Sequence, residues 1–276
     1  MGGLDKKGTN WFIFDLETSK FKYGFTASYR YNLSHKLASS STIFYGKIEG
    51  SDQLTSDPWR NNRNLSFTTH IIDFSWTYEY YLLRPQPGHL YKISGAKGLK
   101  PMKLDIYGYF GIGAFYYEPF AQGTALRYIG TEGQGIPGGG SYYNLFALSF
   151  PVGGSINYHI TKDIKFGIDV SYKWTSTDYL DDVSGNYFDK SKIAEIRGET
   201  AAYLSDPSSG KNPLWTSTGE QRGDPKWRDG FMFAIFKVTY MPLKKSKIKS
   251  TKKKKSNKSF VTGKTKGSNK RSWWMY

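Results

Sequence analysis

The stretch Ile164 to Gly185, IKFGIDVSYKWTSTDYLDDVSG, sets the pattern that the rest of the chain follows. In its first half, large apolar side chains alternate with small or charged ones. The apolar positions are Ile164, Phe166, Ile168, Val170, Tyr172 and Trp174, and the others are Lys165, Gly167, Asp169, Ser171, Lys173 and Thr175. A period of two over this length is typical of a β-strand with one apolar and one polar face. The second half turns polar and acidic, which predicts a long loop after the strand.

Seven further stretches alternate in the same way or are short apolar runs, and aromatic residues make up 17% of the chain, which favours sheet over helix. These predicted strands are Asn10 to Leu16, Phe21 to Leu33, Lys36 to Ile48, Leu65 to Leu83, Leu104 to Glu118, Tyr143 to Ile160 and Phe231 to Tyr240. Tight turns near Ser34 and Thr161 alternate with long polar loops at Glu49 to Asn64, Phe120 to Tyr142 and Thr177 to Asp229. An even strand number with short turns at one end and long loops at the other is typical of bacterial outer-membrane barrels. The sequence therefore predicts, over residues 1–243, an all-β, eight-stranded antiparallel up-and-down transmembrane β-barrel with long extracellular loops.

Periodicity alone does not tell whether the apolar faces point outward to lipid or inward to a soluble core. The polar faces carry both signs of charge, which can pair in a closed interior, and the apolar faces are very aromatic for the core of so small a barrel. Both features favour the membrane barrel over a soluble barrel or sandwich. We expect the charged residues to fill the interior as a polar plug that leaves no conducting channel. These residues are Lys22, Arg30, Asp73, Glu79, Asp105, Lys165, Asp169, Lys173 and Lys237.

The net charge of +16 belongs to the end of the chain. Residues 244–276 hold thirteen Lys or Arg and no acid, so +3 remains for residues 1–243. This composition predicts a disordered tail with a binding run at Lys252, Lys253, Lys254 and Lys255. Anionic lipid, nucleic acid or an acidic protein surface would suit it. After a last strand the tail would enter the periplasm, which excludes nucleic acid and favours lipid or a secretion protein; a solvated tail with no partner is the alternative.

Five segments together resemble one family: Ser56 to Phe67, Tyr107 to Pro119, Thr131 to Gly135 (TEGQG), Thr177 to Tyr187 (TDYLDDVSGNY) and Gln221 to Phe233. They are similar to the PorG-type outer-membrane barrel of the type IX secretion system of Bacteroidota. The resemblance implies a non-enzymatic part of protein export in the cell outer membrane. Such proteins are expected to contact outer-membrane lipid and the periplasmic ring built by a lipoprotein and its partner. The chain departs from the family in its altered beginning and its longer basic tail.

The outer loops hold several charged residues that we expect to form a salt-bridge network or a docking surface. They are Asp57, Arg60, Arg63, Asp178, Asp181, Asp182, Arg222 and Asp224. The three acids at the start of the longest loop also offer oxygen ligands for Ca²⁺, although Asp and Gly at a strand end are more typical of a turn that caps backbone donors.

Nothing in the sequence predicts an enzyme, a cofactor or a metal centre. The chain has no Cys, and its four His residues are scattered. The Gly-rich run from Gly133 to Gly140 lacks the Gly-Lys-Ser/Thr ending of a phosphate loop, and no nucleophile elbow is present. Met1 to Lys7 contains no apolar run of signal-peptide length, so we expect a mature or truncated form, or a protein that is not exported. A free-standing, adhesin-like barrel that binds ligands through its loops is the alternative function.

Overall fold

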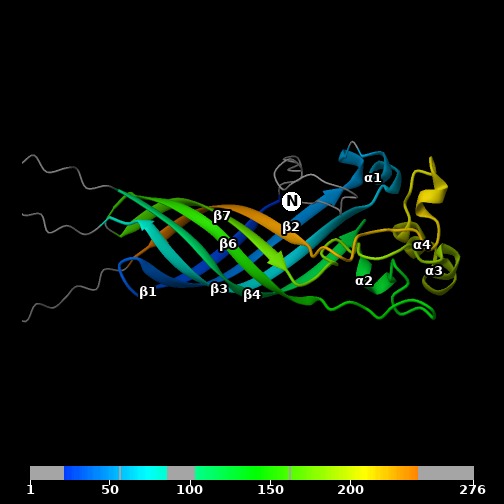
Figure 1. Ribbon diagram of the computed structural model, residues 1–276, viewed down its shortest axis with the longest axis horizontal. Helices are drawn as coiled ribbons and strands as arrows, with labels where there is room; N and C mark the ends of the chain where they lie inside the picture. Colours follow the sequence, from blue (N-terminus) through cyan, green and yellow to red (C-terminus); the bar gives the residue numbers. More distant parts are fainter. Residues whose placement is uncertain (1–21, 56, 86–102, 162, 242–276) are drawn as a thin grey trace, which may run out of the picture. The chain divides into compact units, whose positions relative to one another are not determined.

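The computed structural model describes residues 22–55, 57–85, 103–161 and 163–241. The chain divides into two units at Met241 and Pro242, and the second unit lies outside the described residues. The predicted strand Asn10 to Leu16 and the lysine run Lys252 to Lys255 also lie outside them. Within the first unit the chain is all-β, with one antiparallel sheet that curls into a half-barrel (Figure 1).

The strands follow one another around the sheet almost in chain order. They are β1 (Gly24–Asn32), β2 (Leu37–Ser51), β3 (Ser66–Leu83), β4 (Leu104–Ala121), β5 (Thr124–Ala125), β6 (Phe146–His159), β7 (Ile164–Thr175) and β8 (Gly230–Tyr240). The order is β1-β2-β3-β4-β6-β7-β8, and the short β5 pairs with β4 alone. Seven of the predicted strands are thus present, with β2 and β4 ending three residues later and β6 starting three residues later than expected. Because every neighbouring pair is antiparallel, β1 and β8 at the two ends of this order run in the same direction.

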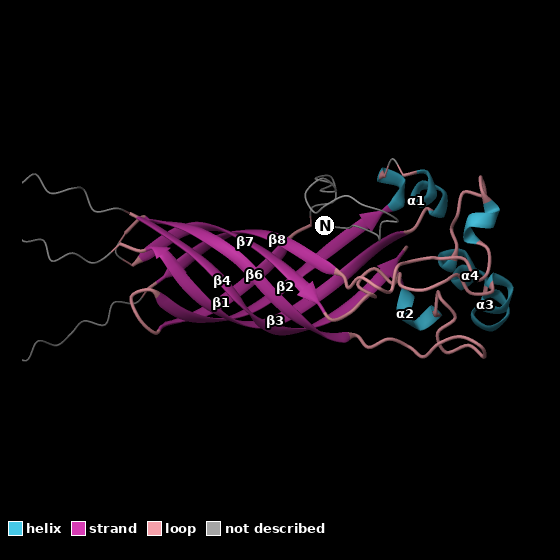
Figure 2. Ribbon diagram, viewed as in Figure 1, coloured by secondary structure: helices cyan, strands magenta, loops and turns pink. Residues whose placement is uncertain are grey.

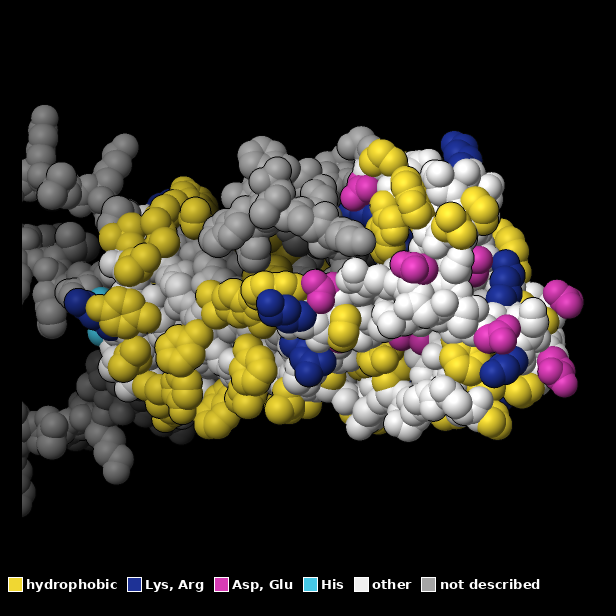
Figure 3. Space-filling view, turned by 45° about the vertical axis from the view of Figure 1, so that its right-hand side comes forward, with side chains coloured by type: hydrophobic (Ala, Val, Ile, Leu, Met, Phe, Trp, Pro, Cys, Tyr) yellow, Lys and Arg dark blue, Asp and Glu magenta, His cyan; other side chains and the backbone are white. Residues whose placement is uncertain are grey.

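The apolar faces of the strands point away from the concave side of the sheet. On β7, Ile168 is 48% exposed whereas Lys173 is only 6% exposed, and the same alternation continues along β3. Hydrophobic side chains accordingly spread over the outer surface of the strands (Figure 3). This polarity is the reverse of the one expected for a soluble barrel, which would bury Ile168, Val170 and Trp174 inside and expose the charges.

Side chains from strands far apart in the sheet meet across its concave side. The rings of Phe44 on β2 and Phe233 on β8 lie 4.0 Å apart between centroids. The ring of Tyr109 lies over Gly153 of β6, where a Cβ atom would come within 2.4 Å of it. Only glycine leaves room for this inward ring, so the residue choice on β6 follows from the curvature of the sheet.

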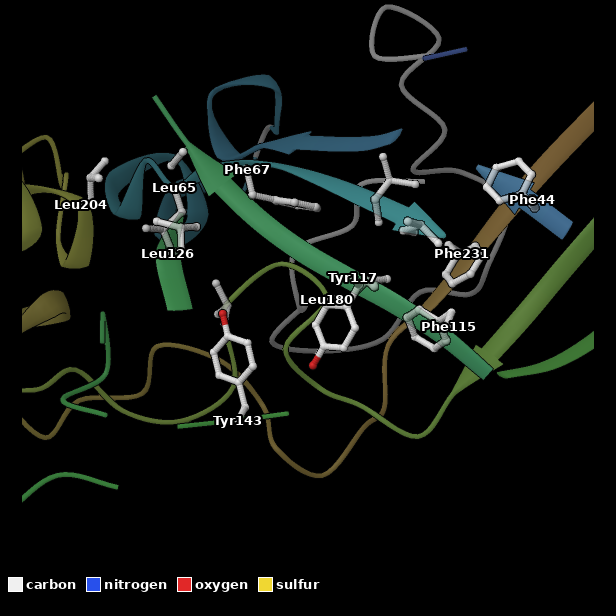
Figure 4. Packing of buried hydrophobic residues seen from close by; sticks show 14 residues of the cluster. Phe44, Leu65, Phe67, Phe115, Tyr117, Leu126, Tyr143, Leu180, Leu204 and Phe231 are labelled. Carbon is white, nitrogen blue, oxygen red and sulfur yellow. The ribbon is translucent and has the colours of Figure 1, made fainter. Parts of the chain in front are cut away.

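An apolar cluster fills the part of the concave side nearest the long loops. It includes Phe44, Phe67, Phe115, Tyr117 and Phe231, and reaches Leu180 and Leu204 of the longest loop (Figure 4). The expectation of a uniformly polar interior is therefore wrong for this part. Apolar side chains pack here because the loops cover this end and exclude water from it.

The three long loops, residues 52–65, 122–145 and 176–229, contain short helices that we refer to, with these loops, as the loop cap. The elements are η2 (Asp52–Leu54), α1 (Pro58–Arg63), α2 (Leu126–Ile129), α3 (Lys190–Arg197), α4 (Glu199–Ser205) and η3 (Pro213–Thr216). All helices lie at this one end of the sheet (Figure 2). At the other end of the sheet, residues 33–36 join β1 to β2.

Helix α1 shows why a predicted loop folds into a helix. The side chain of Asp57 accepts a hydrogen bond from the backbone N–H of Trp59 at 2.9 Å, and Pro58 occupies the first helical position. Asn64 ends the helix in the left-handed conformation, with φ of 60°. These are the usual start and stop signals of a short helix.

None of the helices in the described part of the chain is long and apolar enough to cross a bilayer.

Candidate functional site: buried ion pairs and the loop cap

Charged side chains on the concave side form three layers along the strands. In the layer farthest from the loop cap, the carboxylate of Asp105 on β4 contacts nitrogen atoms of two side chains. One is the ammonium group of Lys165 on β7, and the other is Nε2 of His159 on β6, at 2.8 Å from Asp105 Oδ1. Asp105 and Lys165 are buried, so this layer is a desolvated ion pair between strands on the two sides of β6.

The middle layer joins both ends of the strand order to β4. Arg30 on β1 lies with Nε 2.7 Å from Oε2 of Glu79, and Lys237 on β8 lies with Nζ 2.8 Å from Oδ2 of Asp169. Both cations also donate to the hydroxyl oxygen of Tyr107, which Lys237 approaches to 2.6 Å. One tyrosine therefore links two ion pairs across the concave side.

The third layer lies next to the apolar cluster. Lys173 on β7 donates to Asp73 on β3, and Ser149 donates to the second carboxylate oxygen of Asp73 at 2.8 Å. The ammonium group of Lys173 lies 5.9 and 6.0 Å from the ring centroids of Phe44 and Phe231. Aromatic faces attract a nearby cation, so this pair marks the boundary between polar and apolar packing.

The structure brings eight of the nine predicted interior residues into these layers, as four cations and four carboxylates. The exception is Lys22, which is exposed beside the loop cap and pairs with Glu49 at 2.7 Å. It precedes β1, where no neighbouring strand among the described residues covers it. Sequence reasoning missed Tyr107, Ser149 and His159, because a polar side chain on an alternating face carries no signal that tells a partner of an ion pair from a residue without such a contact.

At the loop cap, Arg63 at the end of α1 binds Asp52 through two hydrogen bonds. Nε lies 2.7 Å from Oδ2, and Nη2 lies 3.1 Å from Oδ1. The remaining nitrogen, Nη1, donates to the backbone carbonyl oxygen of Arg222 at 2.5 Å. Both Arg63 and Asp52 are buried. A forked guanidinium–carboxylate pair of this kind fixes orientation as well as distance, so the first loop is held against the third.

Arg222 continues the chain of contacts into the second loop. Its Nη1 lies 3.0 Å from Oε1 of Glu132 and donates to the carbonyl oxygen of Asp182 at 2.5 Å. Glu132 also accepts from the backbone N–H groups of Ser184 and Gly185, at 2.9 and 3.1 Å. Burial disfavours a charged guanidinium, but Glu132 and Asp182 together outweigh it and raise the pKa of Arg222.

Asp182 is fully buried at the centre of these contacts. Its carboxylate accepts from the hydroxyls of Thr131 and Tyr143, the latter at 2.6 Å, and lies 3.8 Å from Nη2 of Arg222. Burial raises the pKa of Asp182 to about 6, against the opposing effects of Arg222, Thr131 and Tyr143. Its backbone is left-handed, with φ of 65°, a conformation that Asp and Asn tolerate better than most residues.

Two of the predicted loop-network acids, Asp57 and Asp224, make local contacts. Asp57 caps α1, and Asp224 accepts from the backbone N–H of Lys226 at 3.1 Å in a turn. Arg63 pairs with Asp52, and Arg60 lies 3.6 Å from that same carboxylate. Local turn contacts occupy the acids closest in sequence, so the arginines reach acids that the fold brings near.

The other two acids at the start of the longest loop, Asp178 and Asp181, contact residues of the same loop. Asp178 accepts from the hydroxyl of Ser184, and Asp181 accepts from the backbone N–H of Val183 at 3.0 Å. In the part of the chain that the structure describes, no group of three His, Asp or Glu side chains is arranged to hold a metal ion. The geometry thus favours the turn over the Ca²⁺ site.

Four of the segments quoted for the family resemblance meet in this one network. Arg63 lies in the segment Ser56 to Phe67, and Glu132 lies in TEGQG. Asp182 lies in TDYLDDVSGNY, and Arg222 lies in the segment Gln221 to Phe233. Sequence reasoning missed Asp52 and Glu132, although Glu132 lies inside a quoted motif. The chain of contacts can hold three loops in one arrangement. Comparison of the chain with protein-family models, with curated proteins and with solved structures finds no match.

Proposed function

We propose that the chain is a non-enzymatic outer-membrane β-barrel of the type IX protein secretion machinery, which holds the periplasmic ring at the outer membrane. The observation that carries the membrane part of this proposal is the inverted polarity of the sheet. Apolar and aromatic faces are exposed along the strands, while eight charged residues pair on the concave side. A lipid bilayer is the solvent in which this arrangement is favourable.

Closure of the barrel is part of the proposal. β1 and β8 run in the same direction, so an antiparallel barrel requires one more strand between them. The segment Asn10 to Leu16, predicted as a strand and placed directly before β1 in the chain, would run opposite to both. An eight-stranded barrel has room only for its own side chains, and the ion-pair layers occupy that room.

The secretion role is supported by the loop and strand segments that resemble the PorG-type family. Their charged residues converge in the loop cap, which makes the cap the feature that the resemblance and the geometry share. In this proposal the cap is extracellular, both chain ends are periplasmic, and the basic run Lys252 to Lys255 meets lipid head groups or the ring proteins.

Two experiments test the proposal in turn. Fractionation with heat-modifiable migration on gels tests the membrane barrel, and a soluble, heat-insensitive protein would overturn it. Co-purification of ring proteins on a tagged barrel after gentle cross-linking tests the secretion role. Absence of the ring proteins would instead support the adhesin-like alternative, which is favoured by exposed apolar side chains on the cap, such as Leu214 (79% exposed) and Trp227 (67% exposed).

A further inference from the structure

Two arginines from different loops flank one tyrosine ring on the loop cap. Arg127 in α2 has its Cζ atom 5.2 Å from the ring centroid of Tyr142, and Arg197 at the end of α3 has its Cζ atom 6.0 Å from the same centroid. Arg127 also lies 5.5 Å from the ring of Tyr128, which is exposed. We call these four residues the arginine–tyrosine cluster.

Neither arginine of the cluster has an acidic partner among the described residues. Arg127 Nε donates to the carbonyl oxygen of Tyr143 at 2.8 Å, and Arg197 Nη2 donates to the hydroxyl of Tyr142. No other hydrogen bond of either guanidinium, and no ion pair, is formed within residues 22–55, 57–85, 103–161 and 163–241. By contrast, the nearby Arg63 and Arg222 face carboxylates.

The acids closest in sequence do not neutralise the cluster. Glu195 and Glu199 flank Arg197, yet neither forms an ion pair with it in the described part of the chain. Glu132, five residues after Arg127, pairs with Arg222 instead, and Glu118 on β4 accepts from the hydroxyl of Tyr116. Two guanidinium groups close to one ring, each with free donors, repel each other and attract an anion.

The cluster borders the outward, apolar face of the sheet. Tyr116 lies on that face near the cap end of β4, where its ring is 5.2 Å from that of Phe146, and Arg127 is close enough to Tyr116 to act on it electrostatically. In a barrel oriented as in the proposed function, lipid head groups lie at this boundary.

We propose that the arginine–tyrosine cluster binds the phosphorylated sugar head group of an outer-leaflet glycolipid. Arg127 and Arg197 donate forked hydrogen bonds to the phosphate oxygens, as guanidinium groups do in phosphate sites. Tyr128 offers an exposed ring with an apolar body and a polar tip beside the sugar. The orientation of this site toward the outer leaflet rests on the proposed function; the phosphate chemistry does not.

The test uses the full chain in detergent, with glucosamine 1-phosphate, inorganic phosphate and lipid A in mixed micelles as probes. The variant R127A/R197A removes both cluster arginines. The matched control K226A/R228A removes the same charge from exposed positions of the same cap. We expect R127A/R197A to weaken binding of glucosamine 1-phosphate and lipid A by about tenfold or more, and K226A/R228A to bind as the wild type does.

Three outcomes would overturn the inference: no binding of the sugar phosphate or lipid A by the wild type, equal losses in both variants, or binding of inorganic phosphate as tight as that of glucosamine 1-phosphate. Heat-modifiable migration of each variant is measured in parallel. If the wild type shows heat-modifiable migration but does not bind the sugar phosphate, only the proposed head-group site is contradicted. If it binds glucosamine 1-phosphate but shows no heat-modifiable migration, only the proposed membrane function is contradicted.

Discussion

The guanidinium of Arg222 lies 3.0 Å from the carboxylate of Glu132, although the two residues are ninety positions apart. Both side chains are buried, and Arg222 also reaches the backbone carbonyl of Asp182. This contact joins the second and third long loops, and Arg63 adds the first through the carbonyl of Arg222. The loops thus form one cooperative unit, and the following predictions start from it.

Arg222→Met should loosen the loop cap. The substitution leaves Glu132 and Asp182 as buried carboxylates without a cation, which costs about 3–5 kcal/mol of local stability. We expect faster proteolytic cleavage within residues 176–229, with the heat-modifiable migration of the barrel retained. Lys190→Met is the control, because the pair of Lys190 with Asp206 spans 3.7 Å and is largely exposed. Equal cleavage rates for both variants would show that Arg222 does not hold the cap.

Asp73 and Lys173 should behave as a coupled pair. Lys173→Met alone leaves a buried carboxylate and should destabilise the barrel by about 3–5 kcal/mol, whereas Asp73→Leu/Lys173→Met should recover much of that loss. Urea unfolding of the refolded protein in detergent, followed by gel migration, measures each free energy of unfolding. Additive effects of the two substitutions would mean that the pair is not energetically coupled.

An arginine on the outward face of β7 should be costly in lipid. Ile168→Arg places a charge near the middle of the strand and should lower the free energy of unfolding in vesicles by about 2–4 kcal/mol. Ile196→Arg, at an exposed position of α3, should change it by no more than about 0.5 kcal/mol. Comparable values for the two variants would contradict a lipid-facing β7.

The stability of the loop cap should fall as the pH rises through the titration of Asp182. Its pKa of about 6 lies above the ordinary Asp value near 3.8, so the folded cap binds the proton more tightly than the unfolded loop does. This contribution is fully present below about pH 4 and is lost as the pH passes 6. Asp182→Asn keeps a residue suited to the left-handed backbone and should remove this pH dependence. Hydrogen exchange of the amides in residues 177–187 at pH 4.5 and 7 compares the two proteins, each corrected for intrinsic exchange. Parallel profiles would rule out the proposed titration.

The wild-type protein should not conduct ions. The three ion-pair layers and the apolar cluster above them occupy the concave side from end to end. Planar bilayer recordings should therefore show no channel of porin size, and a stable current of that size would contradict an interior filled by side chains.

The sequence by itself determined where the strands run and which face of each is polar. Alternation in β3 and β7 is a local property, because successive side chains of a strand point to opposite faces whatever the strand packs against. For this reason Asp73, Asp169 and Lys173 could be assigned to one side of the sheet from their positions alone. Only the structure decided that this polar face lies on the concave side of the sheet. A period of two is the same whether the apolar face points inward or outward.

Tertiary structure alone decided which charges meet. Asp52 and Glu132 partner the loop arginines because the curled sheet brings three loops to one end, and a loop sequence has no period that reports such distances. The carboxylate of Asp57, nearer to Arg60 and Arg63 in sequence, instead accepts from the backbone N–H of Trp59 in α1. The apolar side chains near the cap are buried because the loops cover this end of the sheet, and the alternation of a single strand does not encode what the loops cover.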